Sequence, residues 1–170
     1  ACGTDMLIAQ ITDTHIKAAG RLAYRRVDSA DKLANCVAHL NALAPRPDIV
    51  LLTGDLVDLG RPEEYALLRE ILAPLAMPLY VVPGNHDVPD ELRRRLSHPP
   101  FQVGGTRILG HWAIVLLDTW YAESDDGEGR LGPTELQALE AALAEHRERH
   151  TLVCLHHPPM SMDAAGLDAL

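Results

Sequence analysis

Four short apolar segments of this chain each run directly into a cluster of aspartate, asparagine or histidine residues. The clearest segment is residues 49–52, Ile-Val-Leu-Leu, which leads into Thr-Gly-Asp and ends at Asp55. An apolar run of this length, bounded by a glycine turn, is typical of a buried strand. Asp55 is therefore expected at the carboxyl end of a strand, where open α/β sheets place their chemistry. The other clusters are Asp13 with His15, Asn85 with His86, and His156 with His157.

The rest of the chain alternates short apolar segments with amphipathic ones. We expect strands over residues 6–12, 49–52, 79–82 and 151–155, and helices over residues 28–43, from residue 61 up to Pro74, 89–96 and 134–149. Two further strands, residues 107–109 and 112–117, meet at Gly110 and His111 and predict a hairpin. This pattern predicts an α/β layered domain, and the hairpin argues against a purely parallel sheet.

Size and composition fit one globular domain over residues 1–170. The chain is 47% apolar and 23% charged, which is ordinary for a domain with a hydrophobic core. The net charge of −9 argues against a nucleic-acid partner, although bound metal ions can hold a phosphate within an acidic protein. Cys2, Cys36 and Cys154 have no metal-type spacing, so we expect free thiols and a reducing, cytoplasmic compartment. We expect no membrane-spanning segment and see no signal peptide.

The residue types in the four clusters suit a pair of divalent metal ions. Imidazole and carboxylate ligands together favour Mn, Fe, Co or Zn, and the absence of paired cysteines argues against a structural zinc site. Two ions bridged by one carboxylate can lower the pKa of a water that attacks phosphorus. Each cluster alone also suits an ordinary turn or loop. Their joint occurrence, each after an expected strand, favours a two-metal hydrolase.

Three motifs resemble the signature of the calcineurin-like metallophosphoesterases. They are D-x-H at residues 13–15, G-D-x-x-D at residues 54–58 and G-N-H-D at residues 84–87. The longer stretch GDLVDLGRPEEY at residues 54–65 and the sequence HHPP at residues 156–159 resemble a narrower branch, the bacterial glycerophosphodiesterases and class III cyclic-nucleotide phosphodiesterases. The similarity runs over residues 6–159. It implies a layered αββα sandwich with mixed sheets.

The resemblance also implies a metal-dependent phosphodiesterase and its ligands. The enzyme would hydrolyse small diesters, either glycerophosphodiesters or 3′,5′-cyclic nucleotides, with a metal-bridging hydroxide. Asp13 and His15 would bind the first ion, Asn85 and His156 the second, and Asp55 would bridge both. Asp55 thereby also takes part in catalysis.

Three more residues receive roles from the same resemblance. His86 would contact the phosphate and stabilise the transition state or assist the leaving group. Asp58 and His157 would not bind metal but would orient the ligands.

The chain departs from the family pattern at its end. A final G-H-x-H motif that gives each ion one more histidine does not follow His156, and the last histidine is His157. We therefore expect the family's C-terminal part to be absent, so that residues 1–170 are the N-terminal portion of a longer protein.

Several alternatives stay open at this point. The same fold could carry a phosphomonoesterase or pyrophosphatase, or a truncated metal-binding domain with little activity. The diester, the identity of the metals and the oligomeric state, including a homo-oligomer, are also open. We expect specificity to come from the loops at residues 16–26 and 118–132. Residues 93–95, three consecutive arginines, suit a solvated helix face, with a contact to the substrate phosphate as the alternative.

Overall fold

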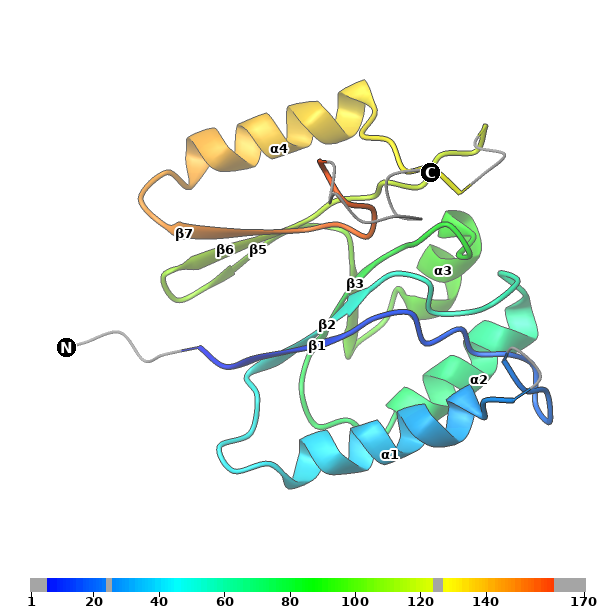
Figure 1. The fold of residues 1–170 in the computed structure, drawn as a ribbon. Coiled ribbons are helices and arrows are strands. Elements are labelled where there is room, and N and C mark those ends of the chain that lie inside the picture. Colours follow the sequence, from blue (N-terminus) through cyan, green and yellow to red (C-terminus); the bar gives the residue numbers. More distant parts are fainter. Residues whose placement is uncertain (1–5, 24–25, 124–126, 161–170) are drawn as a thin grey trace.

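The computed structural model, which describes residues 6–23, 26–123 and 127–160, is a sandwich of two sheets between helices (Figure 1). The first sheet runs in the order β1 (Ile8–Ile11), β2 (Ile49–Thr53), β3 (Leu79–Val82) and β4 (Phe101–Val103). Its strand pairs are all parallel. The connecting helices α1 (Ser29–Ala42), α2 (Pro62–Leu72) and α3 (Pro89–Leu96) all lie on its outer face.

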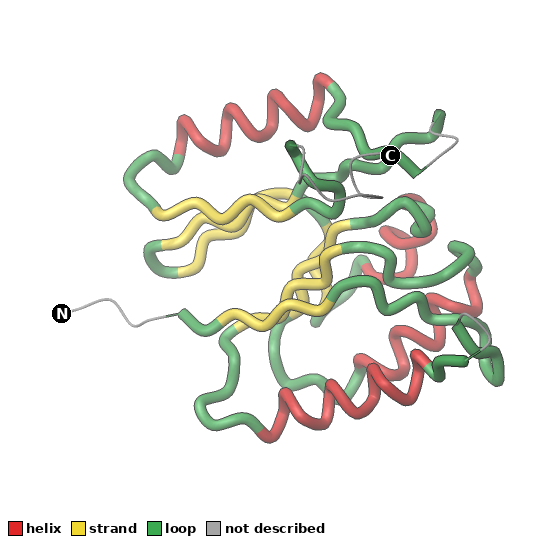
Figure 2. Tube along the Cα trace, in the orientation of Figure 1, coloured by secondary structure: helices red, strands yellow, loops and turns green. Residues whose placement is uncertain are grey.

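The second sheet is mixed. It contains β5 (Gly105–Leu109), β6 (Trp112–Leu116) and β7 (His150–Cys154) in that order. Strands β5 and β6 form the antiparallel hairpin that the sequence predicts, and β7 is parallel to β6. Helix α4 (Pro133–Glu145) covers the outer face of this sheet, as the red helices on both sides of the yellow strands show in Figure 2. The predicted αββα sandwich is therefore confirmed.

Alternation along β2 shows how the apolar strands are buried on both faces. Val50 and Leu52 pack against the layer of α1, α2 and α3, whereas Ile49 and Leu51 pack against the second sheet. A third cluster joins β6 to α4. Strands covered on both faces consist of continuous apolar runs, which is why the sequence identified them so readily.

Two elements differ from the sequence-based expectation. Strand β4 was not expected, because three residues are too few to show a periodicity and its extended form depends on pairing with β3. Helix α4 was expected to reach Arg149 but ends at Glu145. The chain turns there because His150 starts β7, where its N–H donates to the carbonyl of His111 at 2.9 Å. The remaining boundaries agree within two residues.

Cys36 and Cys154 are free thiols, and Cys2 lies outside the described residues. Within the described parts of the chain, no helix combines the length and the apolar character needed to cross a membrane.

Candidate metal centre

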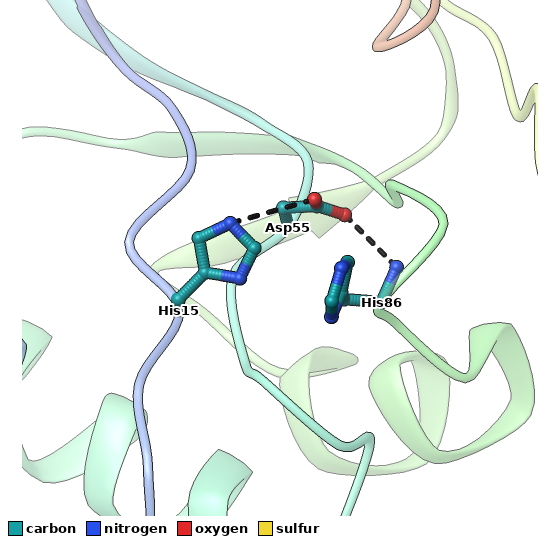
Figure 3. A group of neighbouring side chains, drawn as sticks. All are labelled: His15, Asp55 and His86. Atoms are coloured by element: carbon teal, nitrogen blue, oxygen red, sulfur yellow. Dashed lines mark hydrogen bonds and ion pairs between the residues drawn. The ribbon is translucent and has the colours of Figure 1, made fainter. Parts of the chain in front are cut away.

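The ends of four strands bring the predicted clusters together. Asp13 and His15 follow β1, Asp55 follows β2, His86 follows β3 and His156 follows β7. Because β1, β2 and β3 are parallel, their carboxyl ends meet at one edge of the sheet. Figure 3 shows His15, Asp55 and His86 converging from three separate segments.

The backbone is strained at three of these positions. Asp13, His15 and Asp55 have φ angles of 54°, 41° and 51°, and within the described ranges no other residue except glycine has a positive φ. Such conformations cost about 1–3 kcal/mol each and cluster at functional sites. Here they are held by hydrogen bonds between the two loops. The Asp13 N–H donates to the Gly54 carbonyl at 3.0 Å, and the His15 N–H donates to the Asp55 carbonyl at 2.9 Å.

Asp55 lies at the centre of the site and is 4% exposed. Its Oδ2 atom is 3.6 Å from Nε2 of His15, and its Oδ1 atom is 3.6 Å from Nε2 of His156. Two ligand atoms on one ion, each about 2.1 Å from it, are roughly 3.0–3.4 Å apart. The two separations are close to this range. Each oxygen of Asp55 thus faces a different histidine.

Two overlapping groups of side chains could each hold a metal ion. His15, Asp55 and His86 form one group, and Asp13, Asp55 and His156 form the other; within each group the ligand atoms lie within 4.8 Å of one another. Asp55 belongs to both groups, as a bridging ligand must. Asp13 also reaches the first group, because its Oδ1 atom is 3.9 Å from Nε2 of His15.

Backbone carbonyls fix the orientation of two histidine rings. Nδ1 of His156 lies 2.8 Å from the Thr53 carbonyl, and Nδ1 of His86 lies 2.8 Å from the Asp58 carbonyl. Since a carbonyl can only accept, each Nδ1 carries the proton. In the neutral ring Nε2 is then an acceptor, and in His156 it faces Asp55. Metal-binding histidines are commonly oriented in this way.

Asp58 lies beside two of the site histidines. Its carbonyl accepts from His86, and its carboxylate Oδ1 is 3.9 Å from Nδ1 of His15. The carboxylate also forms an ion pair with Lys17. The orienting role of Asp58 stays a prediction.

The structure places Asn85 and His157 against the loop that follows β6. Asn85 is exposed, and its side-chain amide lies next to the backbone of Gly127. His157 accepts a hydrogen bond at Nδ1 from the Thr119 hydroxyl at 2.7 Å and donates from Nε2 to the Gly127 carbonyl at 3.0 Å. Burial lowers the pKa of His157, which favours this neutral ring. Both ring nitrogens of His157 therefore bond to this loop, at Thr119 and Gly127. The ring also contacts the ring of His156 in a T-shaped arrangement.

Gly84 is a glycine because Asp55 and His156 leave no room for a side chain. A Cβ atom there would lie 2.3 Å from Oδ1 of Asp55 and 2.9 Å from Nε2 of His156. The site therefore requires the backbone of the loop after β3 to approach the carboxylate directly.

Two residues of this region were given no role by the sequence analysis. Asp87 is 1% exposed and accepts hydrogen bonds from the backbone of Leu56 and Gly84 and from the hydroxyl of Tyr65. Burial raises the pKa of Asp87 to about 6. Asp87 is the last residue of the G-N-H-D motif, and Tyr65 is the last residue of the stretch GDLVDLGRPEEY. The motifs quoted from the sequence therefore contain both residues.

The three consecutive arginines do not share one environment. Arg94 and Arg95 pair with Glu91 of their own helix, in agreement with a solvated face. Arg93 instead reaches Asp118 at the end of β6, with 2.6 Å between Nη2 and Oδ2. It thus ties α3 to the second sheet.

The model of the calcineurin-like phosphoesterase family matches residues 6–166 of the chain. The chain belongs to the calcineurin-like phosphoesterase family. The predicted family is therefore confirmed.

Curated relatives of this calcineurin-like phosphoesterase include both predicted kinds of enzyme. A probable glycerophosphodiester phosphodiesterase from Arcobacter nitrofigilis is 35% identical over 96% of this chain and 61% of its own length. A 3′,5′-cyclic-nucleotide phosphodiesterase from Nostoc is 33% identical over 95% of this chain and 60% of its own length. A 3′,5′-cyclic adenosine monophosphate phosphodiesterase from Haemophilus influenzae is 31% identical, over 95% and 58%. The chain thus spans about 60% of the length of these relatives.

Proposed function

We propose that this protein hydrolyses small phosphodiesters with two divalent metal ions bound around Asp55. The observation that carries the proposal is the position of the Asp55 carboxylate, with one oxygen 3.6 Å from His15 and the other 3.6 Å from His156. A carboxylate shared in this way suits a pair of adjacent ions.

Four of the proposed ligands, Asp13, His15, Asp55 and His156, lie close enough together to hold metal ions, whereas the side-chain amide of Asn85 lies beside Gly127. Asp13, His15 and Asp55 would hold the first ion, and Asp55, Asn85 and His156 the second. This mixture of imidazole, carboxylate and amide donors suits Mn, Fe, Co or Zn. When bound, such ions polarise the phosphoryl group and make water a nucleophile at neutral pH.

We propose that His86 donates a proton to the leaving oxygen of the substrate. Its Nδ1–H is held by the Asp58 carbonyl, while the side chain remains exposed. A proton taken up at Nε2 can be donated to the departing oxygen of the diester, which is general acid catalysis. Asp58 would act through His86 by fixing the ring, and not by contacting the substrate.

Charge and the names of the relatives both support a small phosphodiester as the substrate. A net charge of −9 opposes binding of a long nucleic-acid backbone, so a small diester is the better candidate. The relatives are named for glycerophosphodiesters and cyclic nucleotides, and we propose a substrate of one of these classes. The free thiols Cys36 and Cys154 suit the cytoplasm, which is the compartment that we propose.

The proposal is tested by removing bound metal and measuring whether added Mn²⁺ restores activity. The protein is stripped with a chelator, Mn²⁺ is added back, and hydrolysis of bis(p-nitrophenyl) phosphate, 3′,5′-cyclic AMP and a glycerophosphodiester is compared with that of p-nitrophenyl phosphate. We expect Mn²⁺ to restore diester hydrolysis and to favour at least one diester over the monoester by about tenfold or more. A preference for monoesters or pyrophosphate would support the alternative enzymes. Binding of Mn²⁺ without hydrolysis would support the alternative of a metal-binding domain with little activity.

A further inference from the structure

The hydroxyl of Tyr65 lies where α2 meets the loop after β3. Tyr65 is fully buried. Its hydroxyl donates to Oδ1 of Asp87 at 3.1 Å and accepts from the N–H of Val88 at 2.9 Å. One side chain from the helical layer thus binds two consecutive residues behind the site.

The other oxygen of Asp87 joins the two loops that carry the site. Oδ2 accepts from the N–H of Leu56, next to Asp55, at 3.2 Å, and from the N–H of Gly84, next to Asn85, at 2.9 Å. Asp87 is therefore the point at which α2, the loop after β2 and the loop after β3 meet.

These bonds determine how Asp55 and His86 lie relative to each other. The N–H of His86 donates to Oδ1 of Asp55 at 2.9 Å, so the two loops also touch at the site itself. The room is small, since even a methyl group on Gly84 would contact Asp55. Buried hydrogen-bond networks of this kind hold one arrangement when every member is satisfied.

We propose that Tyr65 is a positioning residue of the metal centre. Its hydroxyl fixes the carboxyl group of Asp87, which in turn fixes the loops that carry Asp55 and His86. The link to metal binding rests on the proposed function, but the fixing of the loops is a property of the metal-free protein. Tyr65 touches neither metal nor substrate.

The test compares Tyr65→Phe with Tyr80→Phe. Both changes remove one hydroxyl from a buried tyrosine, but Tyr80 is on β3 and packs in the core between the two sheets. Amide hydrogen exchange is measured in the metal-free proteins at Leu56, Gly84 and His86. In Tyr65→Phe we expect exchange at these amides to accelerate by about tenfold or more relative to the strand amide of Val81. In Tyr80→Phe we expect no such local change.

Affinity for Mn²⁺, measured by calorimetry, gives the second readout. Loss of a group that orients ligands typically lowers metal affinity by about 10- to 100-fold, and we expect this of Tyr65→Phe and not of Tyr80→Phe. Unchanged exchange at Leu56 and Gly84, uniform acceleration at all amides, or unchanged affinity despite loosened loops would each overturn the proposal.

Failure of Mn²⁺ binding and failure of Tyr65→Phe to fold can both be told apart from failure of this proposal. If the unaltered protein binds no Mn²⁺, the proposed function fails, while the exchange data still decide whether Tyr65 fixes the loops. If Tyr65→Phe does not fold, the hydroxyl proton of Tyr65 is observed by NMR in the unaltered protein. A slowly exchanging proton supports the hydrogen bond to Asp87, and rapid exchange with water overturns it.

Discussion

Nε2 of His156 faces Oδ1 of Asp55 across 3.6 Å, although the two residues come from different sheets. Asp55 follows β2 and His156 follows β7, so the contact spans the sandwich. The Thr53 carbonyl holds the opposite nitrogen of the same ring. The candidate metal centre therefore contains residues from both sheets, and each residue can be substituted separately.

Asp55→Asn should remove the shared ligand and leave the fold in place. The amide keeps the size of the side chain and can still accept from the His86 N–H, but it loses the negative charge. We expect Mn²⁺-dependent diester hydrolysis to fall by at least about 100-fold, because charge stabilisation by bound metal contributes several kcal/mol. Asp48→Asn, at the other end of β2, is the matched control and should keep activity. Full activity in Asp55→Asn would refute the bridging assignment.

The adjacent histidines His156 and His157 should respond differently to removal. His156→Ala deletes a proposed ligand and should lower Mn²⁺ affinity by about tenfold or more. His157→Ala should leave that affinity within about threefold, because its ring bonds to Thr119 and Gly127 and not to Asp55. Calorimetric titration with Mn²⁺ measures both, and equal losses would mean that His157 also supports the ligands.

Gly84→Ala should disturb the centre through packing alone. The added methyl group would lie 2.3 Å from Oδ1 of Asp55, so the carboxylate or the loop must move. Overpacking of this kind costs typically about 1–3 kcal/mol, and we expect Mn²⁺ affinity to fall as well. Gly132→Ala is the control, since nothing lies within 4 Å of the added atom. Thermal unfolding and Mn²⁺ titration of both variants decide the matter, and a harmless Gly84→Ala would show that the loops are more adaptable than the geometry suggests.

Stability should depend on pH through Asp87. Burial raises its pKa from 3.8 in the unfolded chain to about 6 in the folded protein. Between these values the folded state binds more protons, so the free energy of unfolding falls as pH rises. The contribution is present in full below pH 4 and is lost as pH rises through 6; a shift of this size corresponds to about 3 kcal/mol.

Denaturant unfolding of the metal-free protein between pH 3.5 and 7 measures this dependence. Asp87→Asn cannot titrate and should flatten the curve in this window. Asp90→Asn changes an exposed carboxylate on α3 and should not. An identical slope in Asp87→Asn and the unaltered protein would assign the pH dependence to other groups.

The sequence predicted the fold, and it predicted that several ligand candidates would lie close together, for physical reasons that the structure makes visible. Buried strands such as β2 are apolar on both faces, so they appear as continuous runs. The ligand candidates Asp13, His15 and Asp55 follow such runs directly, and parallel pairing then brings them to one edge. Neither inference needs a contact between distant residues to be known in advance.

The remaining features depend on contacts that the sequence does not display. Asp87 is satisfied by Leu56 and Tyr65, which are 31 and 22 residues away along the chain. A motif shows that Asp87 is present but not which groups it bonds. Strand β4 and the early end of α4 are likewise set by pairing with neighbouring strands, and local propensity does not reveal such pairing.

Anomalous diffraction from crystals soaked in Mn²⁺ tests the central claim most directly. We predict two peaks, one between His15 and Oδ2 of Asp55 and one between His156 and Oδ1 of Asp55. A single peak, or two peaks that do not share Asp55, would contradict a dinuclear centre built around this carboxylate.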